Sequence, residues 1–198
     1  MTDKEHSPEE KEEEKSQARL DYEEGQEHMK NADTPQAANM FHNALIGFEQ
    51  EGDEHGVANA ADKLGDICAE REDYDTALTH YERAYSICEK DVDSFSLFSL
   101  EKKKAHVLYQ AKRYQDAATM YLDIIDEYQA MRNPQGTIDT LEILADVYVG
   151  MGDKEKAADS YRLAASIHKN YKHKRLAEDF LKKAEEVLTG KVSQVKSD

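Results

Sequence analysis

The chain has 198 residues, of which 39% are apolar and 34% are charged, and its formal net charge is −16. This apolar content is enough for a folded core and excludes wholesale disorder, while the negative charge disfavours binding to nucleic acid or to an anionic membrane surface. No apolar run reaches the roughly 20 residues of a membrane span, no secretory signal follows Met1, and the two cysteines make no disulfide framework, so we expect a cytoplasmic protein.

Apolar residues recur at helical spacing along most of the chain and predict nine helices. We expect an acidic, disordered tail over residues 1–12 and a second disordered tail over 190–198. The first eight helices form pairs with short turns, at 13–31 and 34–50, 54–71 and 74–90, 95–111 and 114–131, and 134–151 and 154–170. The ninth, at 174–189, carries on one face Leu176, Phe180, Leu181, Ala184 and Leu188 and is expected to cap the last pair.

A period of 40 residues runs through the sequence and is visible in four columns of small or aromatic residues. The columns are Ala37, Ala77, Ala117 and Ala157; Phe41, Tyr81, Tyr121 and Tyr161; Ala44, Ala84, Ile124 and Ala164; and Gly25, Gly65, Ala105 and Ala145. A glycine or alanine in the middle of a helix is expected where a second helix comes close. The columns therefore predict antiparallel helix hairpins with close contacts at the small residues.

The stretch from Leu64 to Ala84 resembles the consensus of the tetratricopeptide repeat, through Leu64-Gly65, Tyr74, Ala77, Tyr81 and Ala84. The resemblance covers about residues 16–171 and implies an all-α, right-handed superhelical array of about four helix hairpins plus a C-terminal capping helix. The repeats would span about 13–51, 52–91, 92–131 and 132–171, and the capping helix 172–189. The 40-residue period resembles that of G-protein-regulator and spindle-orientation adaptors, although Asp66 and Asp146 stand where those adaptors carry asparagine.

The resemblance implies that the first helix of each pair lines a concave groove that holds a partner segment. By register, the groove residues are Tyr22, Gln26, Asn59, Asp62, Lys63, Asp66, Lys102, Lys103, His106, Tyr109, Asp139, Glu142 and Asp146. The positions of the family's carboxylate clamp for chaperone tails hold Tyr22, Gln26, Lys63, Ser99 and Lys103, so we do not expect that ligand.

The charges in this groove alternate along the array. Acidic bands at Asp62/Asp66 and at Asp139/Glu142/Asp146 lie on either side of a basic band at Lys102/Lys103. This pattern predicts a partner peptide or helix that carries Lys or Arg. Ordinary exposed helix residues would give the same pattern, and that alternative stays open.

Enzyme motifs are missing from the sequence: it has no phosphate-binding glycine loop, no HExxH, no CxxC and no nucleophile elbow. We therefore expect a non-catalytic adaptor or assembly factor without metal or cofactor, and we expect Cys68 and Cys88 to be structural thiols rather than a redox pair. One alternative is an accessory or sensor subunit that binds a small ligand or regulates an enzyme partner. Another is a self-associating scaffold. The acidic amino-terminal tail is a further candidate occupant of the groove.

Overall fold

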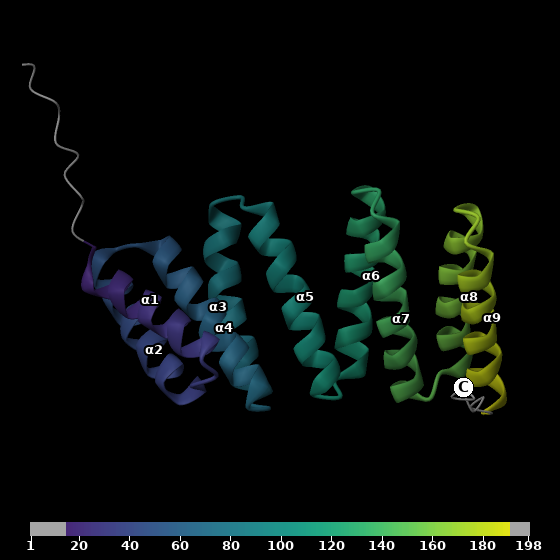
Figure 1. Cartoon of the computed structure of the whole chain (residues 1–198), viewed down its shortest axis with the longest axis horizontal. Coiled ribbons are helices and arrows are strands. Elements are labelled where there is room, and N and C mark those ends of the chain that lie inside the picture. Colours follow the sequence, from purple (N-terminus) through teal and green to yellow (C-terminus); the bar gives the residue numbers. More distant parts are fainter. Residues whose placement is uncertain (1–14, 191–198) are drawn as a thin grey trace, which may run out of the picture.

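Residues 15–190, the part of the chain that the structure describes, form nine α-helices and no strand in the computed structural model (Figure 1). The helices are α1 (Gln17–Lys30), α2 (Thr34–Glu51), α3 (Glu54–Glu70), α4 (Tyr74–Lys90), α5 (Ser94–Gln110), α6 (Tyr114–Ala130), α7 (Pro134–Met151), α8 (Lys154–Asn170) and α9 (Lys174–Thr189). The predicted all-α fold and its nine helices are confirmed. The tails predicted to be disordered fall, apart from Gly190, outside the described residues.

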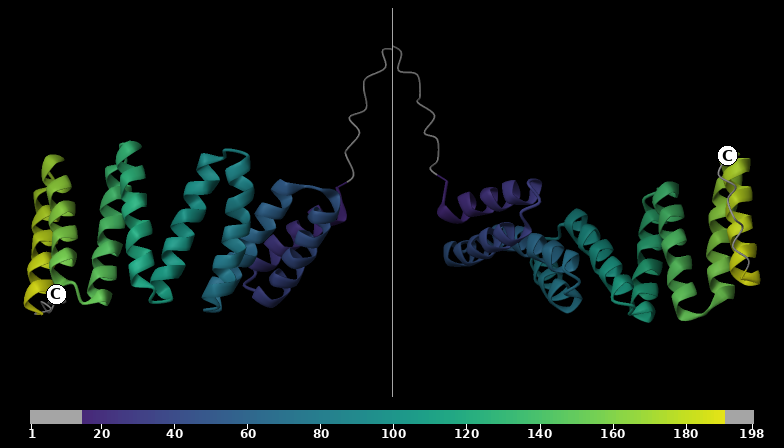
Figure 2. Two further views of the ribbon diagram at one scale, coloured as in Figure 1. Left: turned by 180° about the vertical axis from the view of Figure 1, so that it is seen from behind. Right: turned by 60° about the horizontal axis from the view of Figure 1, so that its bottom comes forward.

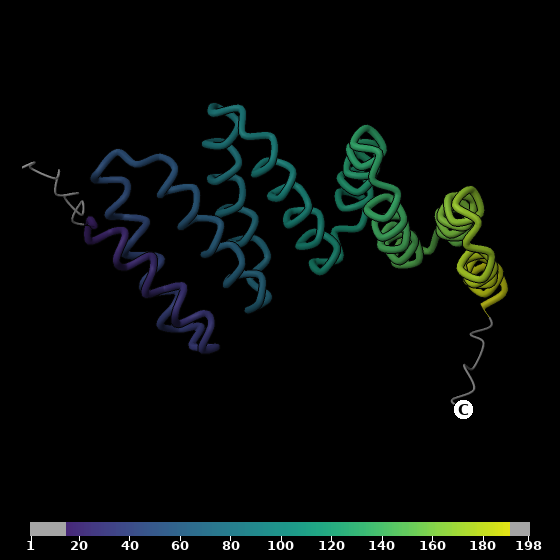
Figure 3. Tube along the Cα trace, turned by 45° about the horizontal axis from the view of Figure 1, so that its top comes forward, coloured from purple at the N-terminus to yellow at the C-terminus, as the bar shows by residue number. Residues whose placement is uncertain are grey.

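The helices follow one another in a single row of hairpins, and each packs mainly on its neighbours in sequence. Figure 2 shows this row from behind and from below, and Figure 3 traces the chain from the amino-terminal to the carboxyl-terminal end of the array. Consecutive helices are antiparallel and form four hairpins, α1–α2, α3–α4, α5–α6 and α7–α8, followed by the capping helix α9. The first helix of each hairpin is therefore α1, α3, α5 or α7. The groove residues predicted from the sequence therefore lie on α1, α3, α5 and α7.

The first helix is shorter than predicted. We expected it to begin at residue 13, but α1 begins at Gln17. Ser16 has extended backbone angles, and its side-chain oxygen accepts a hydrogen bond from the backbone N–H of Arg19 at 3.3 Å. This is the geometry of a helix N-cap, in which a serine hydroxyl satisfies an amide that has no partner inside the helix. All other predicted helix ends agree with the structure to within one residue.

The eight turns between helices share one design that recurs every 20 residues. Each turn contains one residue with positive φ; two are Gly52 and Gly152, and the other six, at φ 53–63°, are Ala32, Glu72, Val92, Lys112, Arg132 and Lys172. At four turns the next residue is an aspartate whose carboxylate accepts from a backbone N–H in the first turn of the following helix, as Asp53 does from Gly56 at 2.9 Å. The residue in the left-handed conformation terminates one helix, and the aspartate directly after it caps the amino terminus of the next. The turns are therefore short.

Val92 is the turn residue least suited to its backbone conformation. Its φ is 55°, and its side chain is 78% exposed, so no packing offsets the strain of a β-branched residue in the left-handed region. We expect Val92→Gly to raise the free energy of unfolding by about 1 kcal/mol, measured by urea denaturation. Gly152→Val, at φ 80°, is the reverse change and should lower it by at least as much. A destabilised Val92→Gly variant would contradict this account.

The repeat columns form the core. The side chains of the column alanines Ala37, Ala77, Ala117 and Ala157 are fully buried, and the aromatic residues four positions later are 0–7% exposed. A Cβ atom on Gly65 would lie 2.5 Å from the Tyr81 ring, and one on Gly25 would lie 2.9 Å from the Phe41 ring. These glycines allow the aromatic ring of the second helix to rest against the backbone of the first. The predicted reason for the small residues is therefore confirmed.

Buried apolar residues gather in two clusters that meet at α5. Leu100 and Val107 belong to the amino-terminal cluster, which extends back to Ala18, whereas Ala105 and Leu108 belong to the carboxyl-terminal cluster, which extends to Ala184. Opposite faces of α5 thus contribute to different clusters. In a linear array each hairpin is stabilised by its neighbours, so this helix couples the two halves.

Helix α9 covers the end of the last hairpin, as predicted for a capping helix. Its buried residues are Ala177, Phe180 and Ala184, and the Phe180 ring stacks on the His168 ring with centroids 5.4 Å apart. Leu176 and Leu181, which we predicted on the same apolar face, are 46% and 52% exposed, because they flank the contact with α8 instead of facing it. Within residues 15–190, no helix has the length and apolar content that crossing a membrane requires.

Candidate partner-binding groove

The acidic band on α3 is neutralised from within the molecule. Lys103, on α5, places its Nζ 2.6 Å from Asp62 Oδ1 and 2.8 Å from Asp66 Oδ1. Lys63 lies 3.4 Å from Asp62 and 3.5 Å from Asp66. The hydroxyl of Tyr81 donates to Asp66 Oδ1 at 2.8 Å. Two carboxylates, two lysines and one hydroxyl therefore form a closed network that joins α3, α4 and α5.

The pKa values in this network follow from burial and from the two carboxylates. Burial by itself would lower the pKa of Lys63, but the charges of Asp62 and Asp66 outweigh it and raise that pKa. Burial raises the pKa of Tyr81, and the neighbouring Asp66 carboxylate raises it further. Lys63 is therefore cationic and Tyr81 is protonated at neutral pH.

A second network lies at the carboxyl-terminal end of the groove. Lys183, on α9, forms an ion pair with Glu142, and its Nζ lies 5.8 Å from the centre of the Tyr161 ring. The Tyr161 hydroxyl donates to Asp146 Oδ1 at 3.3 Å. Burial beside these groups raises the pKa of Asp146. Asp139 is exposed, as is Asp146, and Asp139 accepts a hydrogen bond from Gln135 at 2.6 Å, within its own helix.

The two networks are copies of one arrangement, placed 80 residues apart. A carboxylate on a first helix, a tyrosine on the second helix and a lysine from the next first helix correspond one to one: Asp66, Tyr81 and Lys103 with Asp146, Tyr161 and Lys183. The sequence prediction compared equivalent positions of the repeats one column at a time, so it did not show this combination of three columns. Comparing the sequence with itself at twice the repeat period would have revealed it.

The third hairpin breaks the arrangement. The three corresponding positions hold His106, Tyr121 and Ile143, so both the carboxylate and the lysine are missing. Tyr121 is 4% exposed, and its hydroxyl is the one buried side-chain polar atom without a hydrogen-bond partner among the described residues. Burial raises the pKa of Tyr121 to about 12, and the nearby Tyr109 adds to the shift. A buried hydroxyl without a partner is costly, so this position differs from its two counterparts.

Two basic residues of α5, Lys102 and His106, are exposed. Lys102 is exposed, and its Nζ lies 4.8 Å from the centre of the Phe98 ring and 5.9 Å from that of Tyr128. His106 is also exposed and has Tyr109 beside it, with ring centroids 6.5 Å apart. Neither Lys102 nor His106 forms an ion pair with a carboxylate of residues 15–190.

The other predicted groove residues differ in accessibility. Tyr22 is buried, and its ring packs edge-on against Phe41 with centroids 5.4 Å apart, so it belongs to the core. Gln26 is half-buried and Asn59 is exposed. A cavity of about 590 Å³ lies between α3 and α5, and its lining includes Asp66, Tyr81, Lys102, Lys103 and His106. The structure thus brings α3 and α5 residues of the predicted set together around one hollow.

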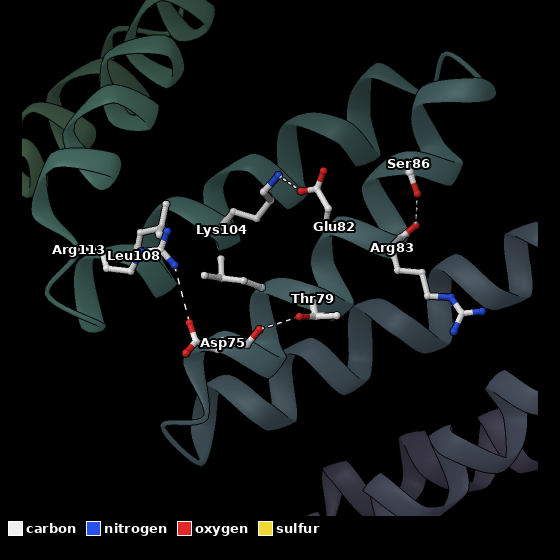
Figure 4. Close-up of a pocket in the computed structure, with 9 residues that line it drawn as sticks. Asp75, Thr79, Glu82, Arg83, Ser86, Lys104, Leu108 and Arg113 are labelled. Carbon is white, nitrogen blue, oxygen red and sulfur yellow. Dashed lines mark hydrogen bonds and ion pairs between the residues drawn. The ribbon is translucent and has the colours of Figure 1, made fainter.

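A second hollow, of about 690 Å³, lies between α4, α5 and the start of α6, and sequence reasoning did not find it (Figure 4). It is lined mainly by α4 residues, together with Lys104, Leu108 and Arg113. Lys104 pairs with Glu82, and Arg113 lies 3.8 Å from Asp75. Because these charges are paired across the hollow, it offers a partner less unsatisfied charge than the groove does.

The two tyrosines Tyr81 and Tyr121 should respond differently to loss of the hydroxyl. Tyr81→Phe removes a hydrogen bond to a carboxylate and should lower the free energy of unfolding by about 1 kcal/mol. Tyr121→Phe removes a buried hydroxyl that has no partner, so the stability should stay the same or rise slightly. Urea denaturation of both variants measures the difference, and an equal loss in both would contradict the assigned hydrogen bonding.

Together, the single row of hairpins and the small-residue contacts between their helices define a helical-repeat protein of the solenoid class. The family model for the tetratricopeptide repeat matches residues 17–90, which hold the first two hairpins. The resemblance to tetratricopeptide repeats predicted from the sequence is confirmed. None of the curated proteins compared with the chain matches it.

Several solved structures have this fold. The apo form of RapI superposes with a TM-score of 0.72 at 15% identity, over 88% of this chain and 49% of RapI. A putative kinesin light chain repeat protein from Podosopora anserina superposes with a TM-score of 0.63 at 12% identity, over 93% of this chain and 100% of that one. A Rap protein in complex with Competence and Sporulation Factor superposes with a TM-score of 0.58 at 16% identity, over 88% of this chain and 52% of the Rap protein. This chain thus spans about half the length of RapI.

Proposed function

We propose that the protein is a non-catalytic adaptor that holds a segment of a partner protein in the groove formed by α3, α5 and α7. The observation that carries this proposal is the pair of exposed residues Lys102 and His106 on α5, which line the cavity of about 590 Å³ and form no ion pair within residues 15–190. The exposed carboxylate of Asp139, on α7, adds to it. A tetratricopeptide array whose core is made of buried small and aromatic residues needs none of these side chains for folding. The Rap structure bound to a factor supports the idea that an array of this fold can hold a ligand.

The finer part of the proposal concerns Lys or Arg in the partner. Asp62 and Asp66 already have two lysines, and Glu142 has Lys183, so these three carboxylates are poor candidates for a second cation. Asp139 is exposed, and Asp146, seven residues or about two helical turns further on, is exposed on the same face of α7. We assign the basic residue of the partner to these two carboxylates.

Site-specific crosslinking tests the location of the site. A photoreactive amino acid at Asn59 or at Asp139 places the probe on the groove side of α3 or α7, and one at Ser86 on α4 places it outside the groove as a matched control. We expect the two groove positions to crosslink to the same partner in cells, with weaker capture after Asp139→Lys is added to the Asn59 probe. Crosslinks from Ser86 alone would overturn the groove assignment.

A further inference from the structure

We propose that the groove reads an acidic side chain of the partner at α5, through Lys102, His106 and the hydroxyl of Tyr121. This inference rests on the proposed function, since it assigns a chemical identity to one position of the bound segment. The starting observation is that three other lysines, Lys63, Lys103 and Lys183, each form an ion pair with a carboxylate of the same chain. Lys102 forms no ion pair within residues 15–190, and its Nζ lies over the rings of Phe98 and Tyr128.

The third hairpin supplies the second observation. In the second and fourth hairpins, a carboxylate on the first helix accepts the hydrogen bond of the column tyrosine. At the corresponding place in the third hairpin stands His106, and Tyr121 keeps its hydroxyl without an acceptor. A carboxylate from a partner would restore the missing acceptor and would find the ammonium of Lys102 and an imidazole N–H beside it.

The hydroxyl of Tyr121 is covered when the groove is empty. Tyr109 is the half-buried neighbour whose presence raises the pKa of Tyr121, and at the corresponding places of the other first helices stand Met29, Ala69 and Val149. The third hairpin therefore carries the bulkiest side chain of this column, Tyr109, whose ring centroid lies 6.5 Å from that of His106. Lys102 and His106 are exposed.

An exposed aromatic residue lies on the same face of α5. Phe95, Ser99, Lys102, His106 and Tyr109 are spaced i, i+4, i+7, i+11 and i+14, which places them along one side of the helix. Phe95 is 86% exposed and borders a small cavity of about 110 Å³ together with the groove residues Asn59 and Asp62. An exposed aromatic side chain on the same face as the unpaired ammonium of Lys102 favours a protein segment with an apolar residue near its acidic one.

Charge complementarity also gives the bound segment a direction. The ammonium of Lys102 and an imidazole N–H of His106, on α5, would bind an acidic residue of the partner. The carboxylates of Asp139 and Asp146, on α7, would bind a basic one. A segment of purely acidic residues would be repelled by α7 and by the net charge of −16. The occupant we infer is therefore a partner segment of mixed charge, with its acidic side chain at α5 and its basic side chain at α7.

The test uses a phage-displayed library of random twelve-residue peptides selected on the full-length protein. We expect the selected peptides to share an Asp or Glu, and a synthetic copy with this residue changed to its amide should bind about tenfold more weakly. The double variant Lys102→Gln/His106→Gln should lose a similar factor, and on it the acid-to-amide change in the peptide should have no further effect. Tyr121→Phe should weaken binding without loss of stability. The matched control is Lys104→Gln, on the opposite face of α5, which should bind normally.

The outcomes separate the inference from the proposed function. Peptides whose affinity falls with Asp139→Asn but not with Lys102→Gln/His106→Gln or Tyr121→Phe would keep the groove adaptor and overturn the acidic position at α5. Affinities that do not respond to any of these groove substitutions, or a library that yields no binding peptide, would overturn both.

Discussion

Replacing Phe41 with alanine should lower the free energy of unfolding of the amino-terminal half by about 3–5 kcal/mol. The Phe41 side chain is fully buried, packs against the Tyr22 ring and fills the space that Gly25 leaves open. Alanine would lose this packing and leave a cavity beside a glycine, where the backbone offers no side chain to fill it. An effect of this size is a large part of the total stability of a typical domain.

The same variant should reveal the division of the core at α5. Phe41 belongs to the amino-terminal cluster, and few residues link that cluster to the second one. In native-state hydrogen exchange, we expect Phe41→Ala to speed exchange strongly in α1–α4 and much less in α7–α9. Leu144→Ala, at a site 2% exposed in the other cluster, is the matched control and should give the opposite pattern. Uniform acceleration through all nine helices would show that the array unfolds as one unit.

The fold could be predicted from the sequence because the physical constraints on it are local and repeated. Every 40 residues, a column alanine and an aromatic residue four positions later place a close helix contact, and the structure confirms these contacts. The turns carry a second, shorter period: Asp33, Asp53, Asp73, Asp93 and Asp153 stand 20 residues apart or a multiple of it, each directly before a helix. Breaks in the apolar pattern were therefore enough to locate helix ends to within one residue from α2 onward.

The groove could be predicted only in part, because long side chains reach across repeats. Register places Asp62, Asp66 and Lys103 on first helices, but it does not tell which lysine bridges to which carboxylate some 40 positions away. Burial was a second difficulty: Tyr22 has groove spacing but packs into the core, since the ring of Phe41 lies next to it. The Tyr121 hydroxyl lacks an acceptor because His106 replaces the aspartate found at the equivalent position of the second and fourth hairpins. Seeing this requires comparing the tyrosine column with the aspartate column, which the sequence prediction did not do.

Replacing Asp66 with lysine should be the most damaging charge change in the groove, with a loss of about 2–3 kcal/mol in the free energy of unfolding. The Tyr81 hydroxyl would lose its acceptor while remaining buried, which costs about 1–3 kcal/mol. The new ammonium would also stand beside Lys63 and Lys103, which would then share the single carboxylate of Asp62. Since the Asp66 side chain is 23% exposed, water screens part of this repulsion and keeps the total moderate.

Asp139→Lys is the matched control, because it makes the same change of charge two repeats further along the groove. Asp139 is exposed and contacts only Gln135 in its own helix, so the free energy of unfolding should change by less than about 0.5 kcal/mol. Urea denaturation of the two variants compares a carboxylate that links three helices with an exposed one whose hydrogen bond stays within its own helix. If Asp66→Lys proved as stable as Asp139→Lys, the network on α3 would be a loose surface cluster, and Asp62 and Asp66 would return as candidates for binding a basic partner.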